Sequence, residues 1–518
     1  MLNLNVGIFG HVDSGKTTLA KALSQVASTA AFDKNPQSQQ RGITLDLGFS
    51  SFIVDTPEHL SMFVEHEKIQ FTLVDCPGHA SLIRTIIGGA QIIDLILLVV
   101  DVTKGIQTQT AECIIIGEIT CPHLIVVLNK IDLLIENDRE RCIAKAQRNI
   151  KRALHATIFA DATIVPISAR SRINDSTVGI STLIDILKGK IFYPQRNIDA
   201  PFLFAIDHCF SIKGKGTILT GTVLQGSVKI EDLIELPEIN LSKKIKSLQM
   251  FKKPVTSASA GDRLGICVTQ FDPKLIERGI ACKSGFTSYI YCGIISAHKI
   301  KYFKGSVSSK SKFHISIGYE TVFANITCFK VNSKLEEFEF NDELQFINEL
   351  NGDNKDAKEY ILLEFEKPTL VIEHCKVIGS KLDLDIHENN CRIAFWGKLI
   401  SCSKDKQYKE TYLTNLKVYK EKLKVGVVDR AVSENTIIVR NLFKKHSNIE
   451  IFINLKVTLS TGETGMIECT FGKNGKVKVS LEGESNNFKT KFDKDNPKIA
   501  VTLTYKQYIF SPKKKIAQ

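Results

Sequence analysis

The sequence predicts an α/β domain followed by three mostly antiparallel β-barrel domains. Over the first 190 residues, short runs rich in Val, Ile and Leu alternate with longer stretches of helical length, as in a parallel sheet covered by helices. After Tyr193-Pro194, short β-rich runs separated by Gly, Asn, Asp, Ser and Pro take over, which is typical of antiparallel barrels. The 518 residues leave room for several domains at roughly 100–200 residues each.

The composition is that of a folded protein in a reducing compartment. Hydrophobic residues make up 43% and charged residues 24% of the chain, which excludes a disordered or fibrous protein. The longest apolar run, Ile92–Val100, contains Asp94 and is too short for a membrane helix, and we expect no secretory signal and no membrane partner. None of the 13 cysteines forms a Cys-x-x-Cys pair, so we expect reduced thiols in the cytoplasm, with the nucleus as a second location. A formal charge of +12 admits nucleic acid as a partner.

Five short apolar runs are predicted to be the strands of the first domain. Runs rich in Val, Ile and Leu fit strands that are buried on both faces of a parallel sheet. The predicted strands are Asn5–Phe9, Phe71–Val74, Leu95–Asp101, Leu124–Leu128 and Thr163–Ile167. The predicted helices between them include Thr18–Val26, Ala80–Gln91 and Asp138–Ala153.

The rest of the chain is predicted to fold as three small barrels. Its predicted strands are Phe202–Asp207, Gly216–Val223, Arg263–Val268, Lys312–Ile317, Lys424–Val428, Thr436–Val439, Ile451–Leu459 and Lys476–Val479. We expect four domains, at residues 1–195, 196–285, 286–402 and 403–518. Residues 331–366 hold 11 acidic residues and 3 lysines, so we expect an acidic loop or insertion there.

A phosphate-binding loop is predicted at residues 10–17, which read GHVDSGKT. The loop follows a predicted strand and precedes a predicted helix, as the GxxxxGK[ST] motif requires. Its glycines let successive N–H groups surround phosphate oxygens, and the helix N-terminus adds a positive dipole. Lys16 is expected to reach the β- and γ-phosphates, and the Thr17 hydroxyl to bind Mg²⁺. The nucleotide-binding residues expected here are Asp13, Ser14, Gly15, Lys16, Thr17 and Thr18.

A second nucleotide motif, Asp75-Cys76-Pro77-Gly78, follows the predicted strand Phe71–Val74. Asp75 is expected to hold Mg²⁺, usually through water. Gly78 is expected to offer its N–H to the γ-phosphate, and its conformational freedom lets a switch segment move. By itself this motif is an ordinary turn at the end of a strand.

Two further motifs predict that the base is guanine. The Asp132 carboxylate in Asn129-Lys130-Ile131-Asp132 can accept two hydrogen bonds from guanine that adenine cannot supply, and Lys130 can pack its stem over the base. Ser168-Ala169 follows the last predicted strand and can present a backbone N–H to guanine O6. All these motifs lie in order at the edge where α/β sheets bind ligands, so they predict a domain that binds GTP or GDP with Mg²⁺.

Between the phosphate loop and Asp75 lies Arg41-Gly42-Ile43-Thr44, and here the chain resembles the translational GTPases of the elongation factor Tu group. Their second switch reads Asp-x-Pro-Gly-His, which residues 75–79 match. The resemblance implies that Thr44 binds Mg²⁺ when the γ-phosphate is present, and that His79 is the catalytic residue that orients the attacking water on the ribosome. It also implies a hydrophobic gate, formed by Val12 and Ile43, that keeps His79 out until activation.

Phrases over most of the chain resemble the eukaryotic selenocysteine-specific elongation factors. They include Arg41–Phe49, Lys246–Phe251, Gly261–Pro273, Leu442–Lys445 and Leu459–Glu463. In that family a pocket of the second domain holds the selenocysteinyl end of the tRNA with an Asp-His pair and an Arg. The resemblance therefore implies a selenocysteine pocket, and the motifs place it at Asp207, His208 and Arg263.

The chemistry of selenocysteine suits such a pocket. A selenol is more acidic than a thiol, so at neutral pH it is largely an anion that Arg263 and a protonated His208 can bind. Asp207 could keep His208 protonated by raising its pKa. Taken without the resemblance, the same residues are more simply an ion pair between Asp207 and Arg263 inside a barrel, with His208 filling a gap.

The resemblance implies an enzyme that binds GTP and selenocysteinyl-tRNA, brings the tRNA to the ribosome at recoded UGA codons and hydrolyses GTP to GDP and phosphate. The fourth domain is too short and too rich in predicted strands for the winged-helix domains of bacterial relatives. We therefore expect a monomer that depends on a separate RNA-binding protein, which recognises the selenocysteine insertion element. Two alternatives remain open: a γ-subunit type of initiation factor that carries initiator tRNA, and a GTP-dependent RNA-binding scaffold.

Overall fold

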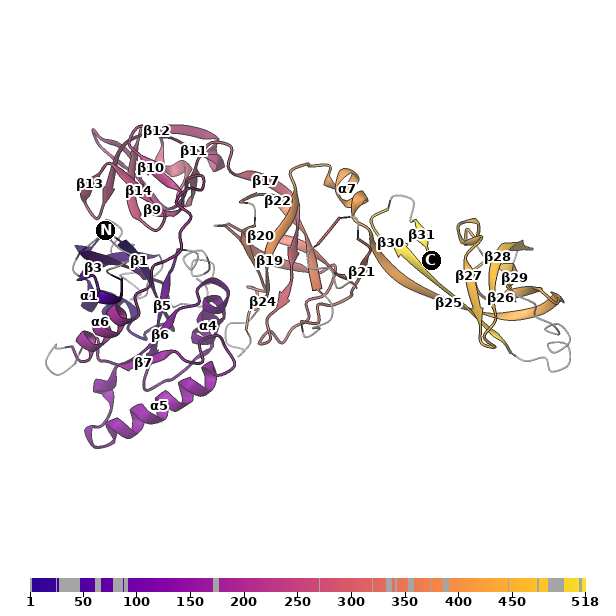
Figure 1. Ribbon diagram of the computed structural model, residues 1–518, viewed down its shortest axis with the longest axis horizontal. Coiled ribbons are helices and arrows are strands. Elements are labelled where there is room, and N and C mark those ends of the chain that lie inside the picture. Colours follow the sequence, from indigo (N-terminus) through magenta and orange to yellow (C-terminus); the bar gives the residue numbers. More distant parts are fainter. Residues whose placement is uncertain are drawn as a thin grey trace.

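The structure is a computed structural model of the 518-residue chain (Figure 1). It describes residues 2–24, 26–27, 47–60, 67–77, 87, 92–170, 177–269, 271–318, 320–331, 338–340, 342–352, 358–372, 374–384, 391–445, 447–472, 475–482, 498–511 and 515–518. Among these residues, no helix is both long enough and apolar enough to cross a membrane.

The first domain is built on a seven-stranded sheet with the strand order β2-β3-β4-β1-β5-β6-β7. The strands β1, β4, β5, β6 and β7 are parallel, as the sequence predicted, and β2 and β3 extend the sheet with antiparallel pairing. Strands β2 and β3 were not predicted from the sequence. The strand bounds are β1 Leu2–Gly10, β2 Val26–Ala27, β3 Gly48–Asp55, β4 Lys68–Asp75, β5 Leu95–Asp101, β6 Leu124–Asn129 and β7 Thr163–Pro166.

Helices cover both faces of this sheet, and a separate apolar core lies on each face. The helices are α1 Lys16–Leu23, α4 Thr108–Thr120, α5 Arg139–Leu154 and α6 Ile180–Gly189. The predicted helix Thr18–Val26 was too long, because Ser24 is already extended and Val26 pairs in the sheet. The predicted helix Ala80–Gln91 lies outside the described residues except for Ile87.

The second domain is a closed barrel in which β11, β16, β8, β9, β15 and β12 pair in turn and β12 pairs back to β11. Its strands are β8 Leu203–Ile212, β9 Gly216–Gln225, β10 Ser227–Lys229, β11 Leu233–Leu236, β12 Leu241–Met250, β13 Lys253–Val255, β14 Ser257–Ser259, β15 Arg263–Val268 and β16 Gly279–Cys282. A β-bulge interrupts the pairing of β8 with β9 between Ile206 and His208. Asp207 is therefore the extra residue at this bulge, a feature that redirects a side chain.

The third and fourth domains are also closed barrels, and a parallel pairing of β21 with β25 joins their sheets. The third contains β17 Ser288–Ser296, β18 His298–Lys299, β19 Lys312–Ile317, β20 Glu320–Val331, β21 Leu344–Phe346, β22 Lys358–Val371, β23 Lys376–Ser380 and β24 Ile393–Ser403. After the short helix α7 (Tyr408–Thr411), the fourth contains β25 Val418–Ser433, β26 Thr436–Arg440, β27 Lys456–Leu459, β28 Thr464–Phe471, β29 Lys476–Leu481, β30 Ala500–Tyr508 and β31 Ile516–Ala517. In Figure 1 the β25–β30 ribbon connects the third barrel to the fourth. These barrels confirm the predicted fold class.

Two sequence predictions about this β-rich part were wrong. The acidic segment 331–366 is not simply a loop or insertion, because it contributes β21 and the first part of β22. The prediction rested on the net charge of the whole segment, which gives no weight to the run Tyr360–Leu363, whose side chains are all buried. The predicted strand Ile451–Leu459 begins as a 3₁₀ turn at Glu450–Phe452, and only Lys456–Leu459 is a strand.

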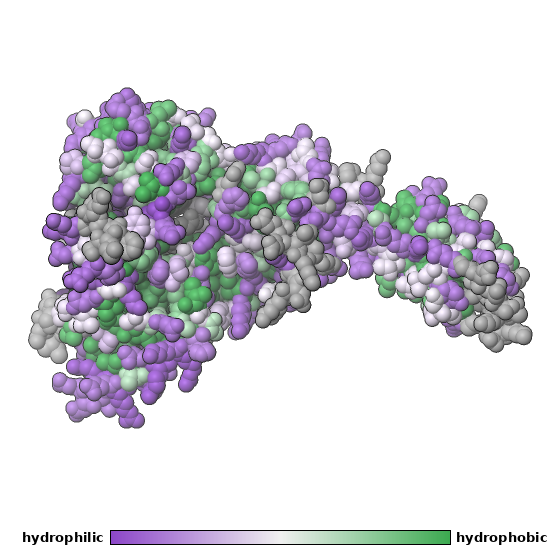
Figure 2. All heavy atoms as spheres, in the orientation of Figure 1, coloured by the Kyte–Doolittle hydropathy of each residue, from purple (hydrophilic) through white to green (hydrophobic). Residues whose placement is uncertain are grey.

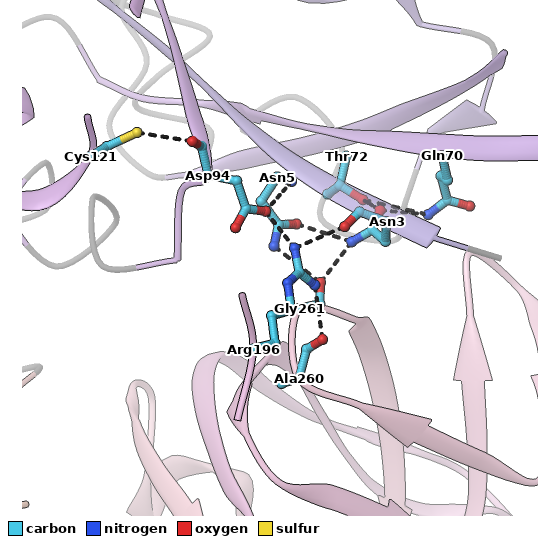
Figure 3. Close-up of polar contacts among 9 residues, drawn as sticks. All are labelled: Asn3, Asn5, Gln70, Thr72, Asp94, Cys121, Arg196, Ala260 and Gly261. Atoms are coloured by element: carbon cyan, nitrogen blue, oxygen red, sulfur yellow. Dashed lines mark hydrogen bonds and ion pairs between the residues drawn. The ribbon is translucent and has the colours of Figure 1, made fainter. Parts of the chain in front are cut away.

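A buried polar network fixes the first domain to the second (Figure 3). The Asn3 and Asn5 side-chain amides both donate to the carbonyl oxygen of Gly261, at 2.6 and 3.0 Å. The Arg196 guanidinium forms an ion pair with Asp94 at 2.5 Å and also donates to the carbonyl oxygen of Ala260 at 2.8 Å. The loop before β15 is thereby held against the β1 side of the first domain, which positions the second barrel beside the phosphate-binding loop's sheet.

Candidate nucleotide and aminoacyl site

The phosphate-binding loop lies between β1 and α1, and its backbone requires two glycines. Gly10 has a φ of 145° and Gly15 a φ of 94°, both in the region that favours glycine. A Cβ on Gly10 would lie 2.3 Å from the carbonyl oxygen of Val99, and one on Gly15 would lie 2.3 Å from the Asn129 side-chain nitrogen. The loop is therefore closed tightly onto β5 and β6.

Lys16 is a buried cation within this loop. Its ammonium group donates to the carbonyl oxygen of His11 at 2.7 Å. Burial lowers the pKa of Lys16 below its ordinary value, although the nearby Asp75 carboxylate opposes this shift. The neighbouring Ser14 hydroxyl oxygen is buried and has no hydrogen-bond partner in the described part of the chain. A polyphosphate would supply negative charge to Lys16 and an acceptor to Ser14, so the residues present fit such a group.

Thr17 and Asp75 lie together beside the loop, at the start of α1 and the end of β4. The Thr17 hydroxyl donates to a carboxylate oxygen of Asp75 at 2.6 Å. A hydroxyl and a carboxylate are hard oxygen ligands of the kind that Mg²⁺ uses next to a nucleotide. This pair therefore fits the predicted Mg²⁺ site. Thr18 is the third residue of α1, next to Thr17.

The predicted base-recognition residues converge through Asn129. Its side-chain nitrogen donates to the carbonyl oxygen of Ser14 at 3.0 Å, and its oxygen accepts from the backbone N–H of Ala169 at 3.0 Å. The Asp132 carboxylate accepts from the Ser168 hydroxyl at 2.6 Å. Lys130 has a left-handed backbone, and its ammonium group pairs with Asp101 at 2.8 Å. The phosphate loop and both base motifs thus form one connected site.

Four predicted site residues lie outside the described residues: Ile43, Thr44, Gly78 and His79. Their roles remain predictions. Of the predicted hydrophobic gate, Val12 is described, and its backbone N–H donates to the Gln109 side-chain oxygen at 3.4 Å. Asp13, the residue before Ser14, has a left-handed backbone with a φ of 61°, so the loop turns at this residue.

In the second domain, Asp207 and Arg263 form a buried ion pair. One guanidinium nitrogen of Arg263 lies 2.5 Å from a carboxylate oxygen of Asp207, and the other carboxylate oxygen accepts from the Thr220 hydroxyl at 2.7 Å. The Arg263 side chain is 4% exposed. His208 is half-buried at the next position of β8. The structure thus contains the ion pair that the sequence allowed as the simpler interpretation.

Arg263 also faces a cavity and a ring from the first domain. The Arg263 guanidinium carbon lies 3.1 Å from the centroid of the Phe49 ring. The residues that line a cavity of about 410 Å³ include Arg263, Thr220 and apolar side chains such as Phe210 and Ile218. Neither Asp207 nor His208 lines this cavity. Phe49 and Thr220 were missed as site residues. Phe49 ends the phrase Arg41–Phe49, but nothing in a single sequence connects it to a strand more than 200 residues later.

Comparison with known proteins identifies the family. Residues 2–193 match the family described as the elongation factor Tu GTP binding domain. The mouse selenocysteine-specific elongation factor is 45% identical, in an alignment that covers 100% of this chain and 99% of the mouse protein. The chain belongs to the selenocysteine-specific elongation factors. The protein of that name from Methanocaldococcus jannaschii is 35% identical, over 94% of this chain and 96% of its own length.

The β-rich part of this elongation factor matches the same family. Residues 294–397 match the third domain of eukaryotic selenocysteine-specific elongation factors, and residues 414–514 match their C-terminal RIFT domain. The crystal structure of elongation factor SelB from Methanococcus maripaludis with the GTP analogue GppNHp has a TM-score of 0.72 and 28% identity, covering 98% of each chain. A bacterial selenocysteine-specific elongation factor has a TM-score of 0.58 at 22% identity, covering 80% of this chain and 62% of its own, and this likeness concerns the fold alone.

These findings establish the general activity. The protein is a GTP-binding translation elongation factor and a GTPase of the selenocysteine-specific family. They favour neither the initiation factor γ-subunit nor the RNA-binding scaffold, the two alternatives that the sequence left open.

Proposed function

We propose that this elongation factor binds GTP with Mg²⁺ and selenocysteinyl-tRNA, delivers that tRNA to the ribosome at recoded UGA codons, and hydrolyses GTP there. One observation carries the aminoacyl part of the proposal: the buried guanidinium of Arg263 lines a cavity of about 410 Å³ and is fixed by Asp207 and Phe49. A cation held in place beside a cavity favours an anionic side chain, and ionised selenocysteine is one.

The surroundings of Arg263 explain how serine would be rejected. Asp207 offsets the positive charge of Arg263, but only one of its carboxylate oxygens accepts a hydrogen bond from the guanidinium group. The other carboxylate oxygen accepts from the Thr220 hydroxyl. A selenolate entering the cavity gains a charge-assisted hydrogen bond from Arg263. A neutral serine hydroxyl on the same tRNA cannot replace the negative charge. A site built for an ionic partner loses more binding free energy when the ion is absent than one neutral contact supplies.

Each described residue of the nucleotide site has a role in this proposal. Lys16 and Ser14 would bind the phosphates, Asp132 and Ala169 would bind the base, and Thr17 and Asp75 would hold Mg²⁺. When bound, Mg²⁺ offsets charge on the phosphates. We infer that Thr44 completes this site, that His79 orients the attacking water, and that Val12 and Ile43 gate its access, because the resemblance to the translational GTPases implies these roles.

The remaining partners follow from the basic, barrel-rich part of the chain. We infer that the second and third barrels hold the tRNA acceptor arm through phosphate contacts, and that the fourth barrel meets a separate protein that reads the selenocysteine insertion element. The net charge of +12 supports an RNA partner. We further propose that the factor acts as a monomer in the cytoplasm and is also present in the nucleus.

A binding competition tests the proposal. The full chain is loaded with a non-hydrolysable GTP analogue and offered one tRNA body charged with either selenocysteine or serine. We expect a preference for selenocysteine of two decades or more, about 2.7 kcal/mol. The variant Arg263→Gln should lose the preference, whereas Lys283→Gln, an exposed charge change in the same barrel, should keep it. Equal affinity of the wild-type protein for both tRNAs would contradict the proposed pocket.

A further inference from the structure

Helix α5 carries a stripe of cations along its exposed side. The stripe consists of Arg141, Lys145, Arg148 and Arg152, all exposed. At 3.6 residues per turn these four positions fall within an arc of about 60° and extend over about 16 Å of the helix. Lys151 and His155 lie beside it and are exposed as well. The opposite side of the helix carries Ile150 and Leu154, which are buried in the core of the first domain.

Among the residues that the structure describes, this stripe has no anionic partner. Within the described ranges, none of the four cations forms an ion pair, and Glu140 is the helix's single acidic residue. Exposed lysines elsewhere do pair with carboxylates, as Lys244 does with Glu231 and Lys478 with Glu468. Like charges three or four residues apart on a helix also repel, by a few tenths of a kcal/mol per pair. The stripe thus weakens the isolated helix, and an external polyanion would relieve it.

The location of α5 separates it from the site proposed for the tRNA end. Figure 1 places α5 at the lower tip of the first domain, away from the second barrel, and Figure 2 shows a hydrophilic surface there. A face composed of cations without an apolar or aromatic anchor does not resemble a protein interface, whose centre is depleted of charge. It does suit a phosphate backbone, which is contacted by Arg and Lys without reading the bases.

We propose that this face of α5 binds the phosphodiester backbone of ribosomal RNA. The inference deepens the proposed function, because it rests on the ribosome as the place where the factor acts. It assigns α5 a contact that positions the first domain on the ribosome, independent of codon and of the aminoacyl group. The Arg and Lys side chains bind phosphates by charge, so this contact weakens steeply with salt.

The salt dependence of ribosome binding tests the proposal. The protein, loaded with a non-hydrolysable GTP analogue, is titrated onto salt-washed ribosomes and, separately, onto deproteinised ribosomal RNA over a range of KCl concentrations. The variant carries Arg141→Gln, Lys145→Gln, Arg148→Gln and Arg152→Gln. Its matched control, with the same change in charge, carries Lys301→Gln, Lys404→Gln, Lys406→Gln and Lys409→Gln, which are exposed outside α5.

We expect the α5 variant to bind both probes at least tenfold more weakly at low salt, with a log–log salt slope reduced by about 3. The control should change the slope by no more than about 1. Equal effects of the two variants would overturn the proposal and make the stripe a solvated face. Weaker binding to ribosomes with unchanged binding to deproteinised RNA would also overturn it, in favour of an acidic ribosomal protein.

Crosslinking gives an independent readout. A photoreactive benzoylphenylalanine replaces Ala144, which is exposed next to the stripe, and the ribosome-bound protein is irradiated. We expect adducts with RNA, and adducts with protein alone would overturn the proposal. The affinity of the α5 variant for selenocysteinyl-tRNA should equal that of the wild type. A failure of the proposed function would appear in that tRNA assay with the wild-type protein, so the two failures are distinguishable.

Discussion

The ring of Phe49 stacks on the guanidinium group of Arg263, with 3.1 Å between the ring centroid and the guanidinium carbon. Phe49 is the second residue of β3 in the first domain, and Arg263 is the first residue of β15 in the second. The same guanidinium also pairs with Asp207 and lines the cavity of the second barrel. One cation therefore joins the nucleotide-binding domain to the proposed aminoacyl pocket.

We expect Phe49→Leu to weaken selenocysteinyl-tRNA binding by roughly tenfold, because a desolvated cation–π contact contributes about 1–2 kcal/mol. Leucine keeps most of the buried apolar volume but leaves Arg263 without the ring that fixes it. GTP affinity should not change. Filter binding with the GTP-loaded protein measures the tRNA affinity. Phe52→Leu is the control, since Phe52 is buried in the same strand but stacks on Phe71. An equal loss of tRNA binding in both variants would show a general packing defect.

We expect Asp132→Asn to change the preferred nucleotide from GTP to xanthosine triphosphate. The Asp132 carboxylate accepts from Ser168 at 2.6 Å, so one of its oxygens is fixed and the carboxylate is held in place for a base. An amide at this position donates where the guanine amino group also donates, whereas xanthine offers an oxygen. Competition between labelled GTP and unlabelled nucleotides measures the change. Asp138→Asn, an exposed neighbour, should have no effect, and an unaltered preference in Asp132→Asn would refute the base assignment.

The nucleotide site could be predicted from the sequence because its residues lie at the ends of strands. Each local motif specifies its own turn, and parallel strands bring those turns to one edge of the sheet. The link from Asn129 to both Ser14 and Ala169 is the outcome of that rule. The barrels were likewise predictable as a class, since their short runs alternate with turn residues.

The contacts between domains could not be predicted in this way. Phe49 and Arg263, or Glu112 and Arg392, are separated by more than 200 residues, and no local pattern indicates which surfaces meet. The acidic segment was misjudged for a related reason. A charge count over 331–366 averages the acidic residues with the buried run Tyr360–Leu363, which pairs with β17 and β20 to complete the third barrel.

We expect Lys16→Met to stabilise the nucleotide-free protein while abolishing nucleotide binding. Burial lowers the pKa of Lys16, so the folded state binds its proton less tightly than the unfolded chain does. The charged form therefore destabilises the folded state at neutral pH, and the wild type regains stability as the pH rises through the lowered pKa towards 10.5. The melting temperature of the variant should exceed that of the wild type by about 2–4 °C at pH 7. This difference in melting temperature should become smaller at alkaline pH.

Thermal unfolding with and without GTP and Mg²⁺ checks both halves of this prediction. Ligand binding to the folded state raises the melting temperature of the wild type by mass action, and it should leave that of Lys16→Met unchanged. Lys21→Met, on the exposed side of the same helix, is the control and should still respond to GTP. A nucleotide-free variant that melts below the wild type would contradict the view that Lys16 is a buried charge in need of phosphate.

A buried ion pair between Glu112 of α4 and Arg392 couples the first and third domains. Two guanidinium nitrogens of Arg392 donate to the two carboxylate oxygens of Glu112 at 2.8 and 2.7 Å, and the side chains are only 5% and 4% exposed. On the same helix, the Gln109 side chain accepts from the backbone N–H of Val12 in the phosphate loop. Helix α4 therefore contacts the nucleotide site and the third barrel at once.

We expect Arg392→Met alone to destabilise the protein by about 3–5 kcal/mol, because it leaves the Glu112 carboxylate buried without its partner. The double variant Glu112→Leu with Arg392→Met should recover most of this loss, since replacing both charges with apolar groups removes the desolvation penalty. Calorimetric unfolding of the wild type, both single variants and the double variant measures the coupling energy. Additive losses would mean that the two side chains do not interact.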